Sequence, residues 1–378
     1  MGIRFIHTAD WQIGKPFGNI PDEAAVPLRQ QRIDTVKKIA MLATKESCDA
    51  VLVAGDVFDS FAVAEKTIYQ TINAMSGFTG PWLLMPGNHD PALAEGVWRE
   101  LHRMELPDNI KLVDSAEVVT LMGGSAVVLP APLQRKHDST DVTEWFDTYV
   151  TEPGVVRIGL AHGSVDDRLP ERGEAPNTIS ARRATKAKLD YLALGDWHGT
   201  QRVDERTWYA GAPETDRFKE NDSGNVLLVD IEAAGLAPKV EKVRVGHYRW
   251  VQLAPQIHTE HGSEEIQQAI KELGEPFENL VLQLTPRGLA DLQTRHQISK
   301  VVASWDASVR YLDYRDDELV GEASAQDLDQ LGAVGFVGDA VRMLQAMAAQ
   351  SESPEEADAA TLALQILFVE HKQLAGKK

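Results

Sequence analysis

The stretch AVLVAGDVFD, residues 50–59, joins an apolar run directly to a polar turn. An unbroken apolar run of this length is typical of a strand that is covered on both faces. The run ends at Gly55-Asp56, and the carboxyl ends of parallel strands are where such sheets bind their ligands. We therefore expect residues 50–54 to form a buried strand and Asp56 to face a binding site.

The same pattern recurs in the first 230 residues of the chain. Further apolar runs at residues 3–6, 82–85, 155–161 and 191–194 end in turns that contain Gly, Asn, Asp or His. Helical patterns lie at residues 29–46 and 65–76, between the first three runs. Alternation of strands and helices predicts an α/β fold with a parallel or mixed sheet. We expect these strand ends to converge on one cleft.

Beyond residue 245 the order of expected elements changes. Expected strands at 247–253, 280–284 and 309–314 alternate with expected helices at 263–273 and 289–304. A polar stretch at 316–330 then precedes two expected helices at 336–349 and 355–374. A chain of 378 residues is long enough for more than one core. We expect a first domain at residues 1–245, a small α+β domain at 246–318 and a C-terminal helical pair at 331–378.

Composition places the chain among soluble globular proteins, because 43% hydrophobic and 25% charged residues are ordinary values for that class. No apolar run approaches the roughly 18 residues of a membrane span. The single cysteine, Cys48, excludes disulfides within the chain and zinc sites built from thiolates, and it indicates a reducing compartment. We expect a cytoplasmic protein without a membrane partner.

The net charge of the chain is strongly negative. Its 38 Lys and Arg residues stand against 57 Asp and Glu residues, which gives −19. Affinity for nucleic-acid backbones comes largely from Lys and Arg, so such a chain is a poor free-standing DNA binder. If DNA is the substrate, metal ions and a partner protein must supply much of the attraction.

The polar strand ends carry oxygen and imidazole donors of the kind that bind divalent cations. They are Asp10, Gln12, Asp56, Asn88, His89, His162, Asp196 and His198. This set suits Mn²⁺ above all, with Mg²⁺, Fe²⁺ and Zn²⁺ as alternatives. One ion takes about four to six ligands, so the set fits two ions that share a bridging carboxylate. Two such ions support in-line phosphoryl transfer, and a histidine outside the ligand set can protonate the leaving oxygen.

The motifs taken together resemble a known family. Asp10-x-Gln12, GDVFD (55–59), GNHD (87–90), AHG (161–163) and GDWHG (195–199) follow, in order, the motifs of calcineurin-like metallophosphoesterases. HTADWQIGKPF (7–17) and the segment from YLALGDWHG to WYAGAPETDRF (191–218) resemble the SbcD/YhaO branch of DNA repair exonuclease subunits. The resemblance covers roughly residues 1–230. It implies a four-layer αββα sandwich, followed here by a small α+β capping domain and C-terminal helices.

The resemblance also implies a role for each donor. Asp10, Gln12, Asp56 and His198 would hold one metal ion, and Asp56 would bridge to a second ion held by Asn88, His162 and Asp196. His89 would be the general acid. The family usually has histidine at positions 12 and 196. A carboxamide at 12 is a weaker ligand and a carboxylate at 196 adds negative charge, which favours Mn²⁺ or Mg²⁺ over Zn²⁺.

We therefore expect a metal-dependent DNA phosphodiesterase, an exonuclease or endonuclease subunit that acts in DNA end processing with an SMC-like, SbcC-type ATPase. Two alternatives remain at this point. The same chemistry could act on nucleotides, small phosphodiesters or phosphoproteins, or the altered ligands could have left a binding subunit without catalysis. The sequence leaves strand preference, polarity and oligomeric state open, a homodimer included.

Plainer interpretations exist for most of these residues. Asp56, Asn88 and His89 could be turn residues, and His162 and His198 could be core histidines. Gln12 could be only a hydrogen-bonding residue, and Asp196 only a partner of His198. Asp90 could cap the segment that follows it.

Two further features have open interpretations. A basic cluster, Arg182, Arg183, Lys186 and Lys188, either contacts DNA or is the solvated face of a helix. The two C-terminal helices either pack on their own domain or dock a helix or coiled coil of a partner.

Overall fold

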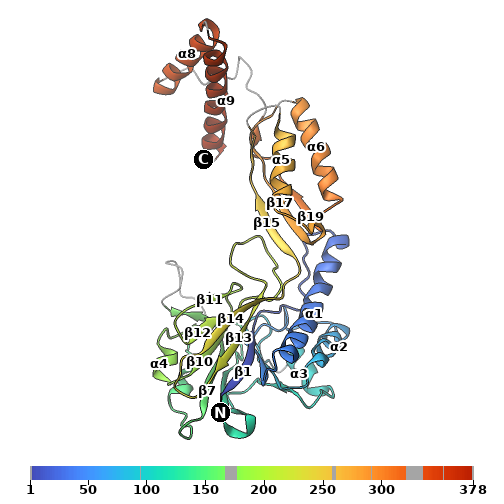
Figure 1. Cartoon of the computed structure of the whole chain (residues 1–378), viewed down its shortest axis with the longest axis vertical. Helices are drawn as coiled ribbons and strands as arrows, with labels where there is room; N and C mark the ends of the chain where they lie inside the picture. Colours follow the sequence, from blue (N-terminus) through green and yellow to red (C-terminus); the bar gives the residue numbers. More distant parts are fainter. Residues whose placement is uncertain are drawn as a thin grey trace. The chain divides into compact units, whose positions relative to one another are not determined.

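The computed structural model describes residues 2–93, 95–166, 177–257, 261–290, 292–320, 335–351 and 353–376. The chain divides into two compact units, Met1–Tyr248 and Arg249–Lys378 (Figure 1). Among the helices in these described ranges, none is long and apolar enough to cross a membrane.

Two six-stranded sheets form the first unit (Figure 1). In spatial order, the first sheet contains β14 (Lys239–Arg244), β13 (Asn225–Ile231), β1 (Ile3–Thr8), β2 (Ala50–Val53), β3 (Trp82–Leu84) and β4 (Ile110–Leu112). The second contains β11 (Gln201–Arg202), β12 (Thr207–Tyr209), β10 (Tyr191–Gly195), β7 (Val156–His162), β6 (Ala126–Ala131) and β5 (Val119–Leu121). The central strands of each sheet are parallel, so their carboxyl ends share one edge.

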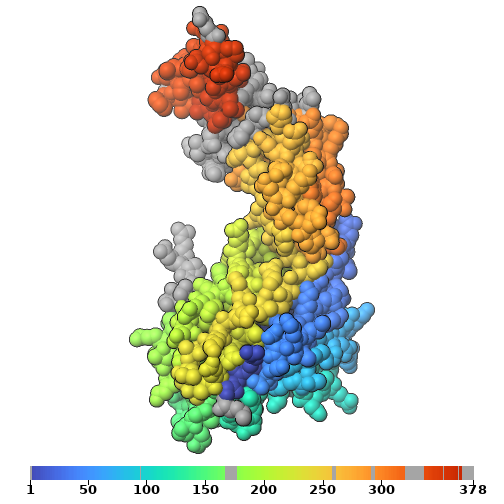
Figure 2. All heavy atoms as spheres, viewed as in Figure 1, coloured from blue at the N-terminus to red at the C-terminus, as the bar shows by residue number. Residues whose placement is uncertain are grey.

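Three layers of apolar side chains separate four layers of backbone in this unit. Alternate residues of a strand point to opposite faces, so in β2 Ala50 and Leu52 pack between the two sheets while Val51 and Val53 face the helices. The helices on the first sheet are α1 (Asp22–Lys45), α2 (Glu65–Ala74) and α3 (Val97–Arg103), which lie on one outer face in blue and cyan in Figure 2. Short helices, η3 (Glu144–Asp147) and α4 (Arg183–Lys186), cover the second sheet.

The αββα sandwich expected from the sequence is therefore confirmed. The five apolar runs are strands, but they are divided between two sheets that face each other. β1, β2 and β3 belong to the first sheet, whereas β7 and β10 belong to the second. The edge and partner strands, including β6 and the antiparallel pair β13 and β14, were not predicted from the sequence.

Helix α1 shows why the first sheet is covered on its outer face. Ala25, Leu28, Val36 and Ile39 are buried and fall on one side of a helix with 3.6 residues per turn, so they form the apolar stripe of a surface helix. Arg32 lies in the same stripe and is also buried, which is unusual for a charged side chain.

The second unit contains a small parallel sheet. Strands β15 (Arg249–Leu253), β17 (Leu280–Leu284) and β19 (Tyr311–Tyr314) are hydrogen-bonded in that order, with α5 (Gly262–Lys271) and α6 (Leu292–Asp306) between them in sequence. A second sheet joins β16 (Gln256–Ile257), β18 (Arg287–Leu289) and β20 (Leu319–Val320). The expected β-α-β-α-β order is present. Of the expected polar stretch, residues 321–330 lie outside the described ranges.

Two helices follow in the same unit, α8 (Gly335–Gln350) and α9 (Pro354–Gly376). They pack against each other as a pair (Figure 1). Both expected C-terminal helices are thus present, and their bounds differ from the expected ones by only a few residues.

A buried histidine joins the two sheets of the first unit. On β1, His7 is fully buried; its Nδ1 lies 3.0 Å from the hydroxyl of Tyr191 on β10, and its Nε2 lies 3.1 Å from the carbonyl oxygen of Leu194. Burial disfavours the charged imidazole and lowers the pKa of His7 to about 3, although the hydrogen bond with Leu194 opposes the shift. His7 is therefore neutral in the folded protein.

This pKa makes the stability of the fold depend on pH. An unfolded histidine titrates near pH 6.5, so acid favours the unfolded state as the pH falls from there toward 3, by on the order of 5 kcal/mol in total. We expect His7→Gln, which cannot titrate, to be less stable than the wild type at pH 7.5. The difference in Tm between the wild type and His7→Gln should be smaller at pH 5 than at pH 7.5. Thermal unfolding followed by circular dichroism measures it, and a gap that is the same at both pH values contradicts the assignment.

Candidate metal centre

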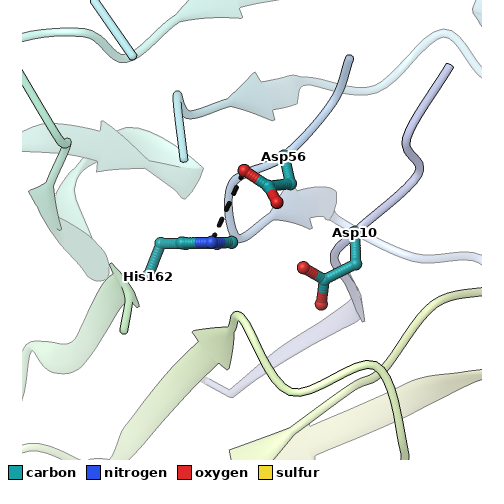
Figure 3. A group of neighbouring side chains, drawn as sticks. All are labelled: Asp10, Asp56 and His162. Carbon is teal, nitrogen blue, oxygen red and sulfur yellow. Dashed lines mark ion pairs between the residues drawn. The ribbon is translucent and has the colours of Figure 1, made fainter. Parts of the chain in front are cut away.

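Three charged side chains from different strand ends meet in the first unit. Asp10 follows β1, Asp56 follows β2 and His162 ends β7. Their ligand atoms all lie within 4.8 Å of one another, and all three residues are buried. Figure 3 shows the carboxylates and the imidazole turned toward one another, with the ion pair between His162 and Asp56 dashed.

Glycines at the turns permit this close approach. A Cβ on Gly55 would lie 2.2 Å from Nδ1 of His162, and one on Gly87 would lie 2.2 Å from Oδ1 of Asp56. A Cβ on Gly195 would lie 2.0 Å from the carbonyl oxygen of Ala54. No Cβ fits at these distances, so any other residue would force the strand ends apart.

The backbone is strained at four of the expected ligand positions. Asp10, Gln12, Asp56 and Asp196 have φ values of 51°, 47°, 51° and 99°, in the left-handed region that residues with a side chain rarely adopt. Such conformations cost about 1–3 kcal/mol each and gather at functional sites.

Hydrogen bonds fix the carboxylates in place. Oδ2 of Asp56 accepts from Nε2 of Gln12 at 2.9 Å, and Oδ1 accepts from the amide of His89 at 2.9 Å. The carboxylate of Asp10 accepts from the amide of Asp196 at 3.2 Å. Oε1 of Gln12 is buried and has no hydrogen-bond partner among the described residues.

The imidazole of His162 has one defined orientation. Its Nδ1 lies 2.8 Å from the carbonyl oxygen of Ala54, which can only accept, so Nδ1 carries a proton. Its Nε2 then faces oxygen atoms of Asn88 at 3.2 Å, Asp56 at 3.5 Å and Asp196 at 3.9 Å. A cation at Nε2, either a proton or a metal ion, is what these oxygen atoms require.

Burial and the neighbouring negative charges shift the pKa values of Asp10 and His162. Burial raises the pKa of Asp10 to about 6, against the opposing effect of His198 and His162. Burial also acts to lower the pKa of His162, but the carboxylates of Asp56, Asp10 and Asp196 outweigh it and raise that pKa to about 9.

The donor set fits a divalent cation. It combines two buried carboxylates, an imidazole nitrogen directed at oxygen atoms and the unpartnered Oε1 of Gln12, without any thiolate. Hard or borderline divalent ions prefer such oxygen and imidazole ligands.

The other expected ligands lie at different distances from this group. Gln12, Asn88 and Asp196 contact its members directly, and Oδ2 of Asp196 also accepts from Ser164 at 2.8 Å. His198 lies outside the group of three, with Nδ1 3.5 Å from Oδ2 of Asp216. The exposed side chain of His89 also lies outside it, with Nδ1 3.1 Å from the carbonyl oxygen of Asp59.

A charged network beside His198 was not predicted from the sequence. Asp216 is buried, and Oδ2 lies 3.0 Å from Nζ of Lys15 and 3.1 Å from Nη2 of Arg32. Burial alone would raise the pKa of Asp216, but His198, Arg32 and Lys15 hold it well below its usual range. In the sequence, this network is indicated only by Arg32, a charged residue inside the apolar stripe of α1.

The structure excludes a helix-capping role for Asp90 and a DNA contact for one member of the basic cluster. Asp90 does not cap the following segment, because its carboxylate accepts from the amides of Gly87 and Phe58 and so holds the GNHD turn against the GDVFD turn. In the basic cluster, Arg183 is buried in ion pairs with Asp141 and Asp147, which excludes a contact with DNA. Arg182, Lys186 and Lys188 are exposed.

The raised pKa of His162 leads to a prediction about metal binding. At pH 7.5 the imidazole is protonated, so a metal ion that binds Nε2 must displace its proton. Calorimetric titration with Mn²⁺ in two buffers of different protonation enthalpy should reveal release of about one proton. His162→Asn should abolish that release. Equal binding heats in the two buffers for the wild-type protein would show that Nε2 is not a ligand.

Comparison with known proteins places this site in a family. The sequence pattern of the calcineurin-like phosphoesterases matches residues 3–229. The SbcD component of the nuclease SbcCD of Bacillus subtilis is 26% identical over 60% of this chain and 66% of its own length. DNA double-strand break repair protein Mre11 of Aeropyrum pernix is 27% identical, over 64% and 61%. The uncharacterized metallophosphoesterase YhaO of B. subtilis is 22% identical, over 61% and 57%.

Each match spans less than two thirds of the relative's own length. The family match, by contrast, includes every strand end that contributes to the buried group, from Asp10 to His198. Members of this family are phosphoesterases that use divalent metal ions. The chain belongs to the calcineurin-like phosphoesterase family.

Proposed function

We propose that this protein is a phosphodiesterase that uses two divalent metal ions, Mn²⁺ in preference. The observation that carries the proposal is the buried group of Asp10, Asp56 and His162 at the ends of facing strands. Ions bound there would lower the pKa of a water molecule and stabilise charge on the phosphoryl oxygens. The remaining steps belong to side chains of the chain itself.

The contacts support a division of the ligands between two ions around Asp56. Asp10, Gln12 and His198 would hold one ion, and Asn88, His162 and Asp196 the other. Asp56 suits the bridging position because its Oδ2 is on the Gln12 side and its Oδ1 is on the side of His162. Asp196 reaches His162 while its amide contacts Asp10, so it lies between the two halves.

His89 is suited to move a proton at the rim of the site. Its amide is bound to Asp56, which places the residue next to the metal centre, while its side chain is exposed. Nδ1 faces the carbonyl oxygen of Asp59 and must carry a proton there. Donation from Nε2 to the leaving oxygen of the substrate would therefore use the doubly protonated imidazolium form, with the second proton on Nε2.

DNA is the substrate that we favour. Two of the similar proteins are named as part of a nuclease and as a DNA double-strand break repair protein. Nucleotides and small phosphodiesters are the second candidate, because a chain with a net charge of −19 attracts DNA poorly without help. A partner protein bound to the C-terminal helical pair could supply the missing attraction to DNA.

We propose that residues 331–378 dock an SMC-like ATPase of the SbcC type, while residues 1–245 form the catalytic domain and 246–318 a capping domain. On α8, Phe336, Met343 and Met347 are exposed, and on α9, Leu362 and Ile366 are exposed. Exposed apolar side chains along a helical pair suit the binding of a partner's helix or coiled coil. A relative that is named as one component of the nuclease SbcCD supports the same assembly.

Substitution of Asp56 and His89 tests the catalytic proposal. With Mn²⁺ present, we expect Asp56→Ala to abolish cleavage of DNA and of bis-p-nitrophenyl phosphate, because the bridging ligand is lost. His89→Ala should reduce turnover by about 10²–10⁴-fold while Mn²⁺ binding persists. His102→Ala is the matched control, since His102 is an exposed histidine on α3. Cleavage by Asp56→Ala at the wild-type rate would refute the proposal.

A further inference from the structure

Trp197 differs from every other tryptophan of this protein. The structure describes all eight, and seven are buried or partly buried, three of them almost completely. Trp197 alone is exposed, with 40% of its surface open to solvent. In the sequence it lies between Asp196 and His198, two of the expected metal ligands.

The backbone on both sides of Trp197 is held firmly. The amide of Asp196 donates to Asp10, and the carboxylate of Asp196 accepts from Ser164. On the other side, the carbonyl oxygen of His198 accepts from the amide of Ala212 at 2.9 Å. A Cβ on Gly199 would lie only 2.9 Å from Nε1 of Trp197, so the edge of the indole rests against that glycine. The ring therefore has a defined support in the turn that carries Asp196 and His198.

Two cations from one turn accompany the exposed ring. Nζ of Lys219 lies 4.5 Å from the centroid of the indole, within the range of a cation–π contact. Nη2 of Arg217 lies 2.8 Å from Nδ1 of His198, and the Arg217 side chain is 47% exposed. The amide of Lys219 donates to the carbonyl oxygen of Arg217, so the two side chains, one on Trp197 and the other on the neighbouring His198, come from one tight turn.

This combination matches the chemistry of a nucleotide. Aromatic rings stack on nucleobases of any sequence, and nearby Lys and Arg side chains attract the phosphates. A supported indole with two cations is also unusual in a chain whose net charge is −19. A site for a small phosphodiester without a base would have no use for an exposed ring that leaves large apolar area in water.

We propose that Trp197 is a stacking platform for a nucleobase of the substrate, next to the scissile phosphate, with Lys219 and Arg217 contacting the flanking phosphates. The proposal rests on the phosphodiesterase function proposed above and specifies its substrate as a single-stranded or locally unpaired nucleic acid. A base inside an intact duplex has its faces covered by its neighbours and cannot stack on the indole.

The test compares two oligonucleotides of equal length and charge, a fluorescein-labelled thymidine 12-mer and the same backbone with abasic spacers. Binding is measured by fluorescence anisotropy in Ca²⁺, and cleavage is measured separately in Mn²⁺. We expect the wild-type protein to bind the thymidine oligomer about tenfold more tightly than the abasic one. Trp197→Ala should bind both equally weakly, and Trp197→Phe, which keeps a ring, should retain most of the preference.

Tyr69→Ala is the matched control, because Tyr69 is an exposed aromatic residue on α2 outside this site. It should keep the tenfold preference. The proposal is overturned if Trp197→Ala retains the preference for bases, or if the wild-type protein shows none. If the wild-type protein prefers the thymidine oligomer but cleaves neither oligomer in Mn²⁺, that result would count against the phosphodiesterase function and not against the stacking site.

Discussion

The structure depends on two carboxylates and an imidazole that are buried together in the seam between two sheets. Asp10 and Asp56 lie within 4.8 Å of His162 and of each other, out of contact with water. Like charges at this distance in a protein interior are unfavourable unless a cation compensates them. The glycine turns, the left-handed backbone at Asp10 and Asp56 and the hydrogen bond from Gln12 are all means of holding this costly arrangement.

Around that acidic group the protein arranges positive charge. Lys15, Arg32 and Arg217 surround the buried Asp216, which lies against His198. Lys219 and Trp197 extend the same rim to the surface. A strongly acidic protein thus has a group of cations around Asp216 and His198, where they would act on an incoming phosphate over a short range. If DNA is the substrate, as we propose, long-range attraction to it would still have to come from bound ions and a partner.

The sequence predicted local features well and long-range contacts poorly. The five strands and their turns could be predicted because an apolar run followed by Gly and a polar residue is a local pattern, and the roles that we propose for Asp56 and His89 come from the family resemblance. The assignment of β7 and β10 to a separate sheet is not local, nor is the contact between His7 and Tyr191, which are 184 positions apart. Arg32 and Asp216 pair across the fold, so neither segment alone showed a site.

A crystal structure after soaking in Mn²⁺, with anomalous scattering recorded at the manganese edge, would show directly whether Asp56 joins two metal ions. We expect two peaks about 3.5–4 Å apart that share Asp56, with Oε1 of Gln12 bound to one ion and Nε2 of His162 to the other. A single peak, or peaks that do not contact Asp56, would show that this carboxylate does not join two ions.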